Sequence, residues 1–210
     1  MTRLARPDAA LLPAYVAALN RDWSPDNVRG LVTTREQLAA IDADAAAFLE
    51  SLDDRDARGA PITLHDGSTM PRLPGYVRWI IDDARDFCGA INFRWQHGTA
   101  DLPDWVPGHI GYAVVPWQQR RGHATRALAL ILEDARALGL AHVDLTAEAD
   151  NLPSHAVIAA NGGTVRLQPS SNHTATNTAQ ARNSTWVPPH LTREPPTAPP
   201  TKNPSDCSVL

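Results

Sequence analysis

The stretch that decides the fold reads Gly108-His-Ile-Gly-Tyr-Ala-Val-Val-Pro116, then Trp117-Gln-Gln-Arg-Arg-Gly-His-Ala-Thr125, then an Ala/Leu-rich segment that ends at Gly139. Residues 110–115 are apolar and partly β-branched and stop at a proline, which is typical of a buried strand. The last segment repeats apolar residues at spacings of three and four before a glycine, which predicts an amphipathic helix with a glycine C-cap. These helix residues are Ala124, Leu128, Ile131, Leu132, Ala135 and Leu138.

The loop between this strand and this helix has the chemistry of an anion site. Backbone N–H groups in the first turn of a helix lack internal partners, and the helix dipole favours negative charge there. Gly122 lets the main chain approach a ligand closely, and Arg120 and Arg121 carry donors suited to phosphate. We therefore predict that the loop holds a diphosphate. The chain has neither the G-x-x-x-x-G-K-S/T pattern of a P-loop nor the G-x-G-x-x-G dinucleotide fingerprint.

Length and composition limit the classes of protein that remain. A chain of 210 residues suggests one domain with appendages, and 43% hydrophobic and 20% charged residues are usual for a soluble globular protein. A net charge of -4 argues against nucleic-acid binding. Cys88 and Cys207 are too few for a disulfide framework or a cysteine metal site, so we expect a cytoplasmic protein without a metal. No stretch approaches the roughly 20 apolar residues of a membrane span.

Two helices and an antiparallel strand pair are predicted before residue 108. The first helix runs from Asp8 to Asn20, and the second starts at a capping box at Thr33 and Thr34 and continues as one face to Leu52. Residues 62–70 contain an Asp-Gly pair and are predicted to form a hairpin. Apolar residues then predict antiparallel strands over Tyr76–Ile81 and Phe87–Trp95, joined by an acidic turn.

A second motif follows the central helix. Residues 141–147 alternate as a strand, and Asp150-Asn151-Leu-Pro-Ser-His-Ala-Val-Ile-Ala-Ala-Asn-Gly-Gly163 predicts a helix that ends at Asn-Gly-Gly. Asn151 and Ser154 can contact a ligand or cap the helix that they begin. Both roles are open at this point.

The two motifs together resemble those of the GNAT N-acetyltransferase superfamily. Gln119-Arg-Arg-Gly-His-Ala124 is similar to its phosphate-binding pattern Q/R-x-x-G-x-G/A, and residues 150–163 are similar to its downstream asparagine-and-helix pattern. The resemblance implies an α/β (α+β) fold with a mixed, mostly antiparallel central sheet flanked by helices. It also implies a parallel pair of strands, on either side of the central helix, that splay apart and open a cleft. We expect this domain to cover residues 1–167.

The resemblance implies acetyl transfer from acetyl-CoA to a primary amine of a small molecule or peptide, by direct attack in a ternary complex. Tyr112, Ala113 and Val114 would line the pantetheine arm, and Asn151 and Ser154 would contact it. The pyrophosphate would be held by Gln119, Arg120, Arg121, Gly122, His123, Ala124 and Thr125. The oxyanion is expected to be stabilised by a main-chain N–H of the central strand.

The catalytic acid and base do not follow from the family pattern. Many members carry a glutamate and a tyrosine where this chain has Thr146 and Ile158. The remaining candidates are His109, Glu148 and Tyr112, with Asp150 as a further carboxylate. His109 has an ordinary pKa near 6.5, which suits amine deprotonation, although a solvated histidine at a strand end has the same pattern. Glu148 can equally be a surface charge.

The residues of the acceptor site are also not assigned by the sequence. Trp79, Trp95 and Trp105, with Asp101 and Asp104, are candidates for an amine-attracting pocket, although tryptophans on strands are more often core. The segment 168–210 is rich in proline, threonine and asparagine and is expected to be disordered, with one short strand at 184–187. The strands that complete the family sheet are then missing, and an exposed edge would favour a homodimer. Thr146 and Ile158 at the two family positions, together with the missing strands, leave an alternative function, a module that binds acyl-CoA without turnover.

Overall fold

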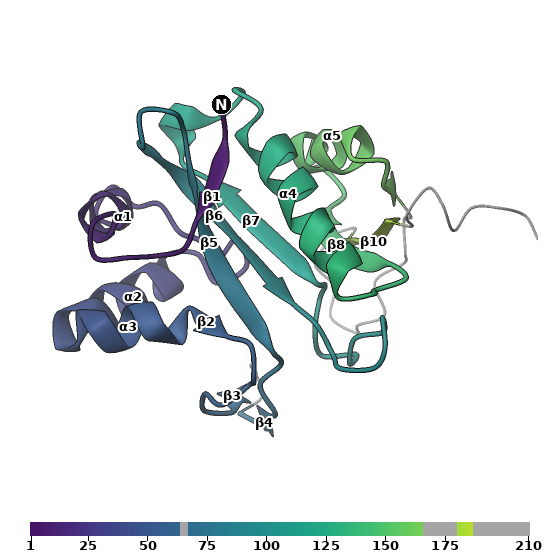
Figure 1. The fold of residues 1–210 in the computed structure, drawn as a ribbon, viewed down its shortest axis with the longest axis horizontal. Helices are drawn as coiled ribbons and strands as arrows, with labels where there is room; N and C mark the ends of the chain where they lie inside the picture. The colour runs from purple at the N-terminus through teal and green to yellow at the C-terminus, as the bar shows by residue number, and fades with distance from the viewer. Residues whose placement is uncertain (64–66, 166–179, 187–210) are drawn as a thin grey trace, which may run out of the picture.

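The structure is a computed structural model that describes residues 1–63, 67–165 and 180–186. Its main sheet has the order β1-β5-β6-β7, with β2 also paired to β5, and every neighbouring pair is antiparallel (Figure 1). The strands are β1 (Arg3–Ala5), β2 (Asp53–Asp54), β5 (Gly75–Ile81), β6 (Phe87–Arg94) and β7 (Ile110–Val114). The predicted β5–β6 pair is confirmed. The sequence analysis did not predict β1, which is only three residues long.

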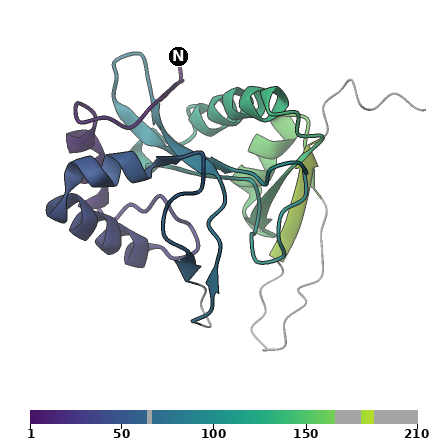
Figure 2. The same cartoon turned by 60° about the horizontal axis from the view of Figure 1, so that its bottom comes forward.

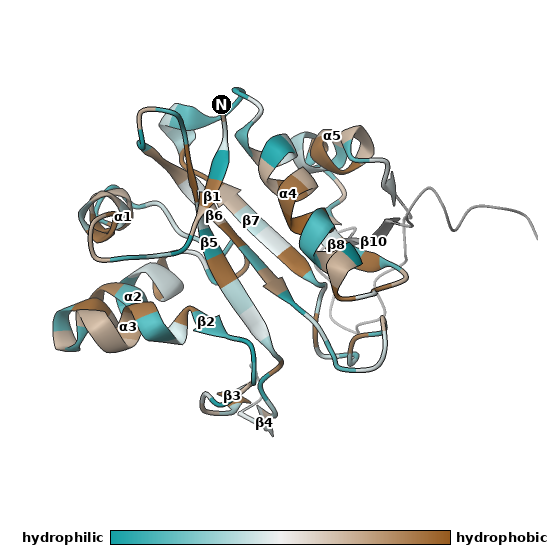
Figure 3. Ribbon diagram, viewed as in Figure 1, coloured by the Kyte–Doolittle hydropathy of each residue, from teal (hydrophilic) through white to brown (hydrophobic). Residues whose placement is uncertain are grey.

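Helices cover the sheet on both faces (Figure 2). Helices α1 (Leu12–Leu19), α2 (Leu31–Ala43) and α3 (Ala45–Ser51) lie on one face, where Trp79 of β5 stacks on Tyr15 of α1 with ring centroids 4.7 Å apart. Helix α4 (His123–Ala137) lies on the other face, and its buried Leu128 and Ile131 pack with Ile80 and Ile91 of the sheet. Brown and teal bands alternate along α4, as its apolar period predicts (Figure 3).

The strand that follows α4 leaves the main sheet. β7 and β8 (Val143–Glu148) belong to different sheets and touch at their beginnings, where the His109 N–H donates to the Asp144 carbonyl at 2.7 Å. β8 pairs with β10 (Gln180–Trp186), which in turn pairs with β9 (Thr164–Val165). The predicted splaying of the strands on either side of α4 is therefore confirmed, and α5 (Leu152–Ala160) packs beside α4.

The helix predicted to run from Thr33 to Leu52 is two helices. Asp44 ends α2 in an extended conformation, and its side chain accepts hydrogen bonds from the N–H groups of Ala46 and Ala47 at 3.0 and 2.9 Å. An aspartate that caps a new helix in this way interrupts an apolar period that otherwise continues across it. The capping box was wrong as well, because Thr33 and Thr34 are buried inside α2.

Other local predictions are confirmed. The hairpin forms from β3 (Ile62–Thr63) and β4 (Thr69–Met70). Gly139 ends α4 with φ +74°, and the Leu140 and Gly139 N–H groups donate to the Ala135 and Arg136 carbonyls, which is a Schellman cap. No helix in the described ranges is long and apolar enough to cross a membrane.

The C-terminal segment contributes more to the fold than expected. The strand predicted at 184–187 begins earlier, at Gln180, and pairs antiparallel with β8 along its length. Its sequence, Gln-Ala-Arg-Asn-Ser-Thr-Trp, lacks the apolar alternation that marks a half-buried strand, and main-chain pairing with β8 is what defines it. Disorder was expected over 168–210, and within this segment residues 168–179 and 187–210 lie outside the described residues.

Candidate functional site

The predicted anion loop is an open helix N-terminus. After β7 the chain passes through a short 3-10 turn (Pro116–Gln118) and enters α4 from Gly122, which has φ +78°. No side chain caps α4, so the N–H groups of its first turn are left for a ligand. A Cβ atom placed on Gly122 would meet nothing within 4 Å, and the loop is exposed. The backbone therefore leaves donors and space for an anion at the start of α4.

The side chains of this loop divide into two groups. Arg120 and Arg121 are exposed, and neither has a carboxylate within 4.0 Å among the described residues, although Arg121 donates to the Gln118 amide oxygen at 2.8 Å. His123 turns inward instead, with Nδ1 3.0 Å from the Thr2 hydroxyl, and burial lowers its pKa. Of His123, only the main-chain N–H is therefore placed to contact an anion. Ala124 and Thr125 complete the open first turn.

The free edge of β7 already receives two hydrogen bonds from side-chain amides. Asn27 donates to the Tyr112 carbonyl at 3.1 Å, and Gln119 donates to the Val114 carbonyl at 3.3 Å. The neighbouring Val115 N–H points the other way, to Cys88 of β6, so the carbonyls of Tyr112 and Val114 face away from β6. This edge can pair with an extended ligand such as a pantetheine arm once the two exposed amides are displaced.

Helix α5 begins beside this edge. Asn151 is its N-cap, since Oδ1 accepts from the Ser154 N–H at 3.1 Å, so the capping role is confirmed. The Asn151 amide nitrogen makes no hydrogen bond with the described residues and stays available. The Tyr112 hydroxyl is buried, and Ser154 of α5 lies beside it. Burial raises the pKa of Tyr112, and Ser154 opposes the shift only in part.

The structure argues against His109 as the base. His109 is fully buried, and its Nδ1 accepts the Asp144 N–H at 2.9 Å, so the neutral ring has its lone pair engaged and its proton on Nε2. Burial lowers the pKa of His109 to about 4, although Asp144 opposes the shift. His109 is thus a structural link between β7 and β8. Glu148 is exposed at the end of β8, with a carboxylate that pairs with no described residue.

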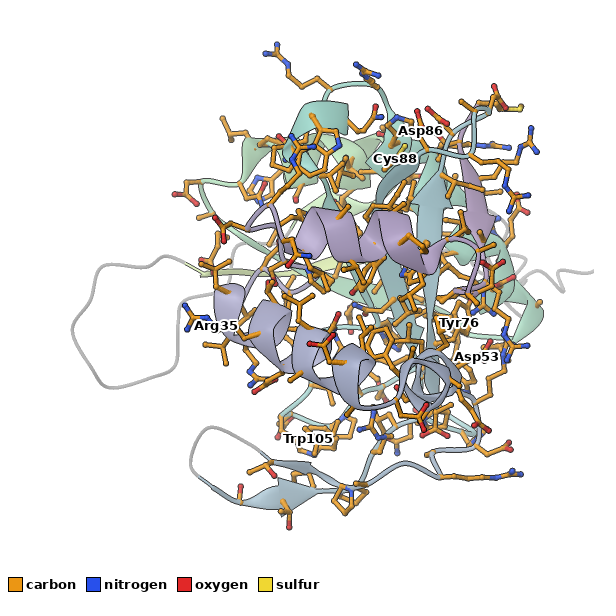
Figure 4. All side chains as sticks on the ribbon, turned by 90° about the vertical axis from the view of Figure 1, so that its left-hand side faces the viewer. Arg35, Asp53, Tyr76, Asp86, Cys88 and Trp105 are labelled. Atoms are coloured by element: carbon orange, nitrogen blue, oxygen red, sulfur yellow. The ribbon has the colours of Figure 1, made fainter. Side chains whose placement is uncertain are left out.

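A cavity of about 160 Å³ lies on the α1–α3 side of the sheet. It is enclosed by the end of α3, the residues around hairpin β3–β4, strands β5 and β6, and Trp105 with Val106. In Figure 4 Trp105 lies between helix α2 and the hairpin. The cavity is lined by Ser51, Leu52, Asp54, Ile62, Arg72, Leu73, Gly75, Tyr76, Val77, Asn92, Phe93, Arg94, Trp105 and Val106.

The cavity changes the predicted set of acceptor residues. Trp79 and Trp95 are core residues, 0% and 4% exposed, and only Trp105 of the three candidate tryptophans reaches the cavity. The sequence analysis missed Asn92 and Arg94. Their signal was present, because two polar residues alternate with Ile91 and Phe93 in a strand whose other face is core.

The chain matches the family described as the acetyltransferase (GNAT) domain over residues 19–164. No curated protein matches it by sequence.

Solved structures share its fold at low sequence identity. The microcin C7 self-immunity acetyltransferase MccE, in complex with acetyl-CoA and AMP, is 14% identical with a TM-score of 0.56, and covers 89% of this chain and 92% of its own. The ribosomal L7/L12 α-N-protein acetyltransferase RimL, in complex with coenzyme A, is 13% identical with a TM-score of 0.54, covering 89% and 93%. Spermidine N-acetyltransferase from Vibrio cholerae, with CoA and spermine, is 10% identical with a TM-score of 0.52, covering 89% and 94%.

Proposed function

The chain belongs to the GNAT acetyltransferase family, and on that premise we propose that it moves an acetyl group from acetyl-CoA to a primary amine of a small molecule or peptide by direct attack in a ternary complex. One observation carries the proposal. The uncapped N-terminus of α4, with open space above Gly122, directly follows a strand whose free edge accepts hydrogen bonds. An anion site and an extended groove in this order fit a cofactor with a diphosphate at one end and a peptide-like arm at the other.

Each part of this unit has a proposed role. The N–H groups from Gly122 to Thr125 and the guanidinium groups of Arg120 and Arg121 hold the diphosphate. The main chain of Tyr112 to Val114 pairs with the pantetheine arm, and the Asn151 amide donates to it from α5. Acetyl-CoA supplies an activated thioester when it is bound.

The transfer forms a bond from the amine nitrogen to the acetyl carbon and breaks the carbon–sulfur bond. The nitrogen then loses a proton, and the departing sulfur gains one. The Tyr112 hydroxyl is our candidate acid, because burial raises its pKa and keeps it protonated at neutral pH. Ile158, which stands in the family's tyrosine position, is 3% exposed and cannot serve. Glu148 and Asp150 are the base candidates, because each is exposed and its carboxylate pairs with no described residue.

Two measurements test the proposal. Titration calorimetry with acetyl-CoA should show one site per chain, and a thiol assay should detect free CoA when a panel of primary amines is added. Omission of the amine provides the control for slow hydrolysis. Absence of acetyl-CoA binding would refute the site, whereas binding without CoA release for any amine would favour the acyl-CoA-binding module. That alternative rests on Ile158 and on the closed environment of His109.

A further inference from the structure

We propose that the acceptor carries an anionic group, a carboxylate or a phosphate, which Arg94 binds in the cavity beside β5 and β6. This proposal rests on the acetyl transfer proposed above and names the class of amine that the same site accepts.

Arg94 is fixed at the wall of the cavity. It is the last residue of β6, its main-chain N–H donates to the His109 carbonyl at 2.9 Å, and its side-chain Nε donates to the Gly108 carbonyl at 2.8 Å. Gly75 stands opposite it in β5, where a Cβ would lie 3.3 Å from the Arg94 Cβ. The stem of the side chain is therefore anchored, and the glycine leaves room in front of it. The two Nη groups make no hydrogen bond with described residues.

Arg94 differs from the arginines around it in having no counter-ion. Arg78 lies 3.0 Å from the Asp53 carboxylate, and Arg72, which lines the same cavity, lies 3.9 Å from that of Asp54. No carboxylate of the described residues lies within 4.0 Å of Arg94. A partly buried guanidinium without a partner is costly, and a bound anion removes that cost.

Asp26 does not serve as the missing partner. It favours the charged form of Arg94 from a distance, but burial outweighs it and lowers the Arg94 pKa. Its carboxylate already accepts hydrogen bonds from the N–H groups of Val28 and Arg29 and from the Thr33 hydroxyl. The cavity wall thus holds Arg72 and Arg94 against the single carboxylate of Asp54, which leaves a net positive charge in a chain whose net charge is -4.

The size and lining of the cavity indicate a small acceptor or one chain end. A volume of about 160 Å³ is close to that of a cavity known to hold a benzene-sized molecule. Leu52, Val77, Trp105 and Val106 supply apolar walls. These features suit a short carbon skeleton with one anionic end.

Asn92 links the wall of the cavity to the central strand β7. Asn92 lies two residues from Arg94 on the same face of β6, and its side-chain oxygen accepts the Gly111 N–H at 3.2 Å. Gly111 directly precedes Tyr112, where the pantetheine arm is proposed to pair. An acceptor whose anion is held at Arg94 therefore extends along Asn92 and presents its amine on the side of the central strand.

The test uses pairs of amines that differ only in charge. β-Alanine against its amide, phenylalanine against its amide, and phosphoethanolamine against ethanolamine separate carboxylate from phosphate. The Arg94→Gln variant loses the charge, but the amide nitrogen of glutamine occupies the place of Nε and keeps a donor for the Gly108 carbonyl. Arg72→Gln is the matched control, because Arg72 lines the same cavity and donates its own Nε to the Ala60 carbonyl at 3.0 Å.

We expect the wild-type kcat/KM to favour the anionic member of at least one pair by about ten- to a hundredfold. Arg94→Gln should remove this preference and leave acetyl-CoA affinity unchanged, and Arg72→Gln should keep it. Equal rates for both members of every pair, or loss of the preference in both variants alike, would overturn the proposal. Failure of acetyl-CoA to bind would instead refute the proposed function, so the two failures are distinguishable.

A binding readout that needs no turnover completes the test. Calorimetry with N-acetyl-β-alanine and with its amide measures the anion contribution directly. The acid should bind more tightly to the wild type and to Gly122→Trp, and the two ligands should bind equally to Arg94→Gln. Tighter binding of the acid to Arg94→Gln would place the anion site elsewhere.

Discussion

The proposed cofactor loop and the proposed acceptor cavity are built in opposite ways. The loop is one continuous segment, from β7 through Gly122 into α4, and its proposed binding groups are main-chain atoms with the two guanidinium groups of Arg120 and Arg121. The cavity is assembled from five separate parts of the chain, and its binding groups are side chains such as Arg94 and Asn92. Main-chain sites depend on local conformation, whereas side-chain sites depend on tertiary packing. Because the two sites share no residues, we expect substitutions to alter cofactor binding and acceptor choice independently.

The largest effect is expected when the space at the start of α4 is filled. Gly122→Trp places a bulky side chain in the space above the open helix N-terminus, and we expect acetyl-CoA affinity to fall by about a hundredfold or more, roughly 2.7 kcal/mol. Calorimetry measures the loss. Anion binding at Arg94 should be unchanged, because the cavity shares no residue with the loop.

Gly139→Trp is the matched control for this variant. Gly139 lies at the other end of the same helix and has φ +74° against +78° for Gly122, and a Cβ atom placed on it would likewise meet nothing within 4 Å. Both substitutions carry the same strain of about 1–2 kcal/mol for a left-handed non-glycine residue. Equal acetyl-CoA affinity in the two variants would contradict the loop as the cofactor site.

The burial of His109 should make the stability of the protein depend on pH. The His109 pKa of about 4 in the folded protein is below the ordinary 6.5, so the unfolded chain binds more protons between these values. Stability should therefore be fully present above pH 6.5 and fall as the pH drops toward 4, by about 2 kcal/mol between pH 7.5 and 5.0. Urea unfolding at the two pH values measures this change.

His109→Asn isolates the contribution of this one group. The asparagine Oδ1 takes the place of Nδ1 and still accepts the Asp144 N–H, but it does not titrate. The variant should lose stability at every pH through poorer packing, and its decrease from pH 7.5 to 5.0 should be smaller than that of the wild type by about 2 kcal/mol. The difference between the two decreases therefore measures the contribution of His109. An identical decrease in both would show that His109 is not the buried neutral link.

The difference between local conformation and tertiary packing also explains which features the sequence predicted. The strand before Pro116, the glycine loop and the helix ending at Gly139 are set by local rules of period, capping and glycine conformation, and all three are confirmed. The break at Asp44 was missed because a cap inside an apolar period is invisible to periodicity. His109 was misjudged because its burial depends on β8, 35 residues away along the chain. Arg94 was missed because its missing counter-ion is a property of the assembled cavity.

The smallest effect is expected at Asn151, where one side chain has both a structural and a binding role. Asn151→Asp keeps the oxygen that caps α5 and places a negative charge at a helix N-terminus, so the free energy of unfolding should change by less than about 0.5 kcal/mol. The variant loses the amide donor, and acetyl-CoA affinity should fall about three- to tenfold if this donor reaches the pantetheine arm.

Asp44→Asn is the reverse exchange at a helix start far from the loop. Its oxygen still accepts from Ala46 and Ala47, and acetyl-CoA affinity should be that of the wild type. Thermal unfolding and calorimetry on both variants separate the two roles of Asn151. Wild-type affinity in Asn151→Asp would leave Asn151 as a cap only, and the cofactor region would then consist of main-chain groups and the two loop arginines. That result would confine the cofactor contacts to one continuous segment of the chain, whereas the expected loss shows that α5 adds a side-chain contact from outside this segment.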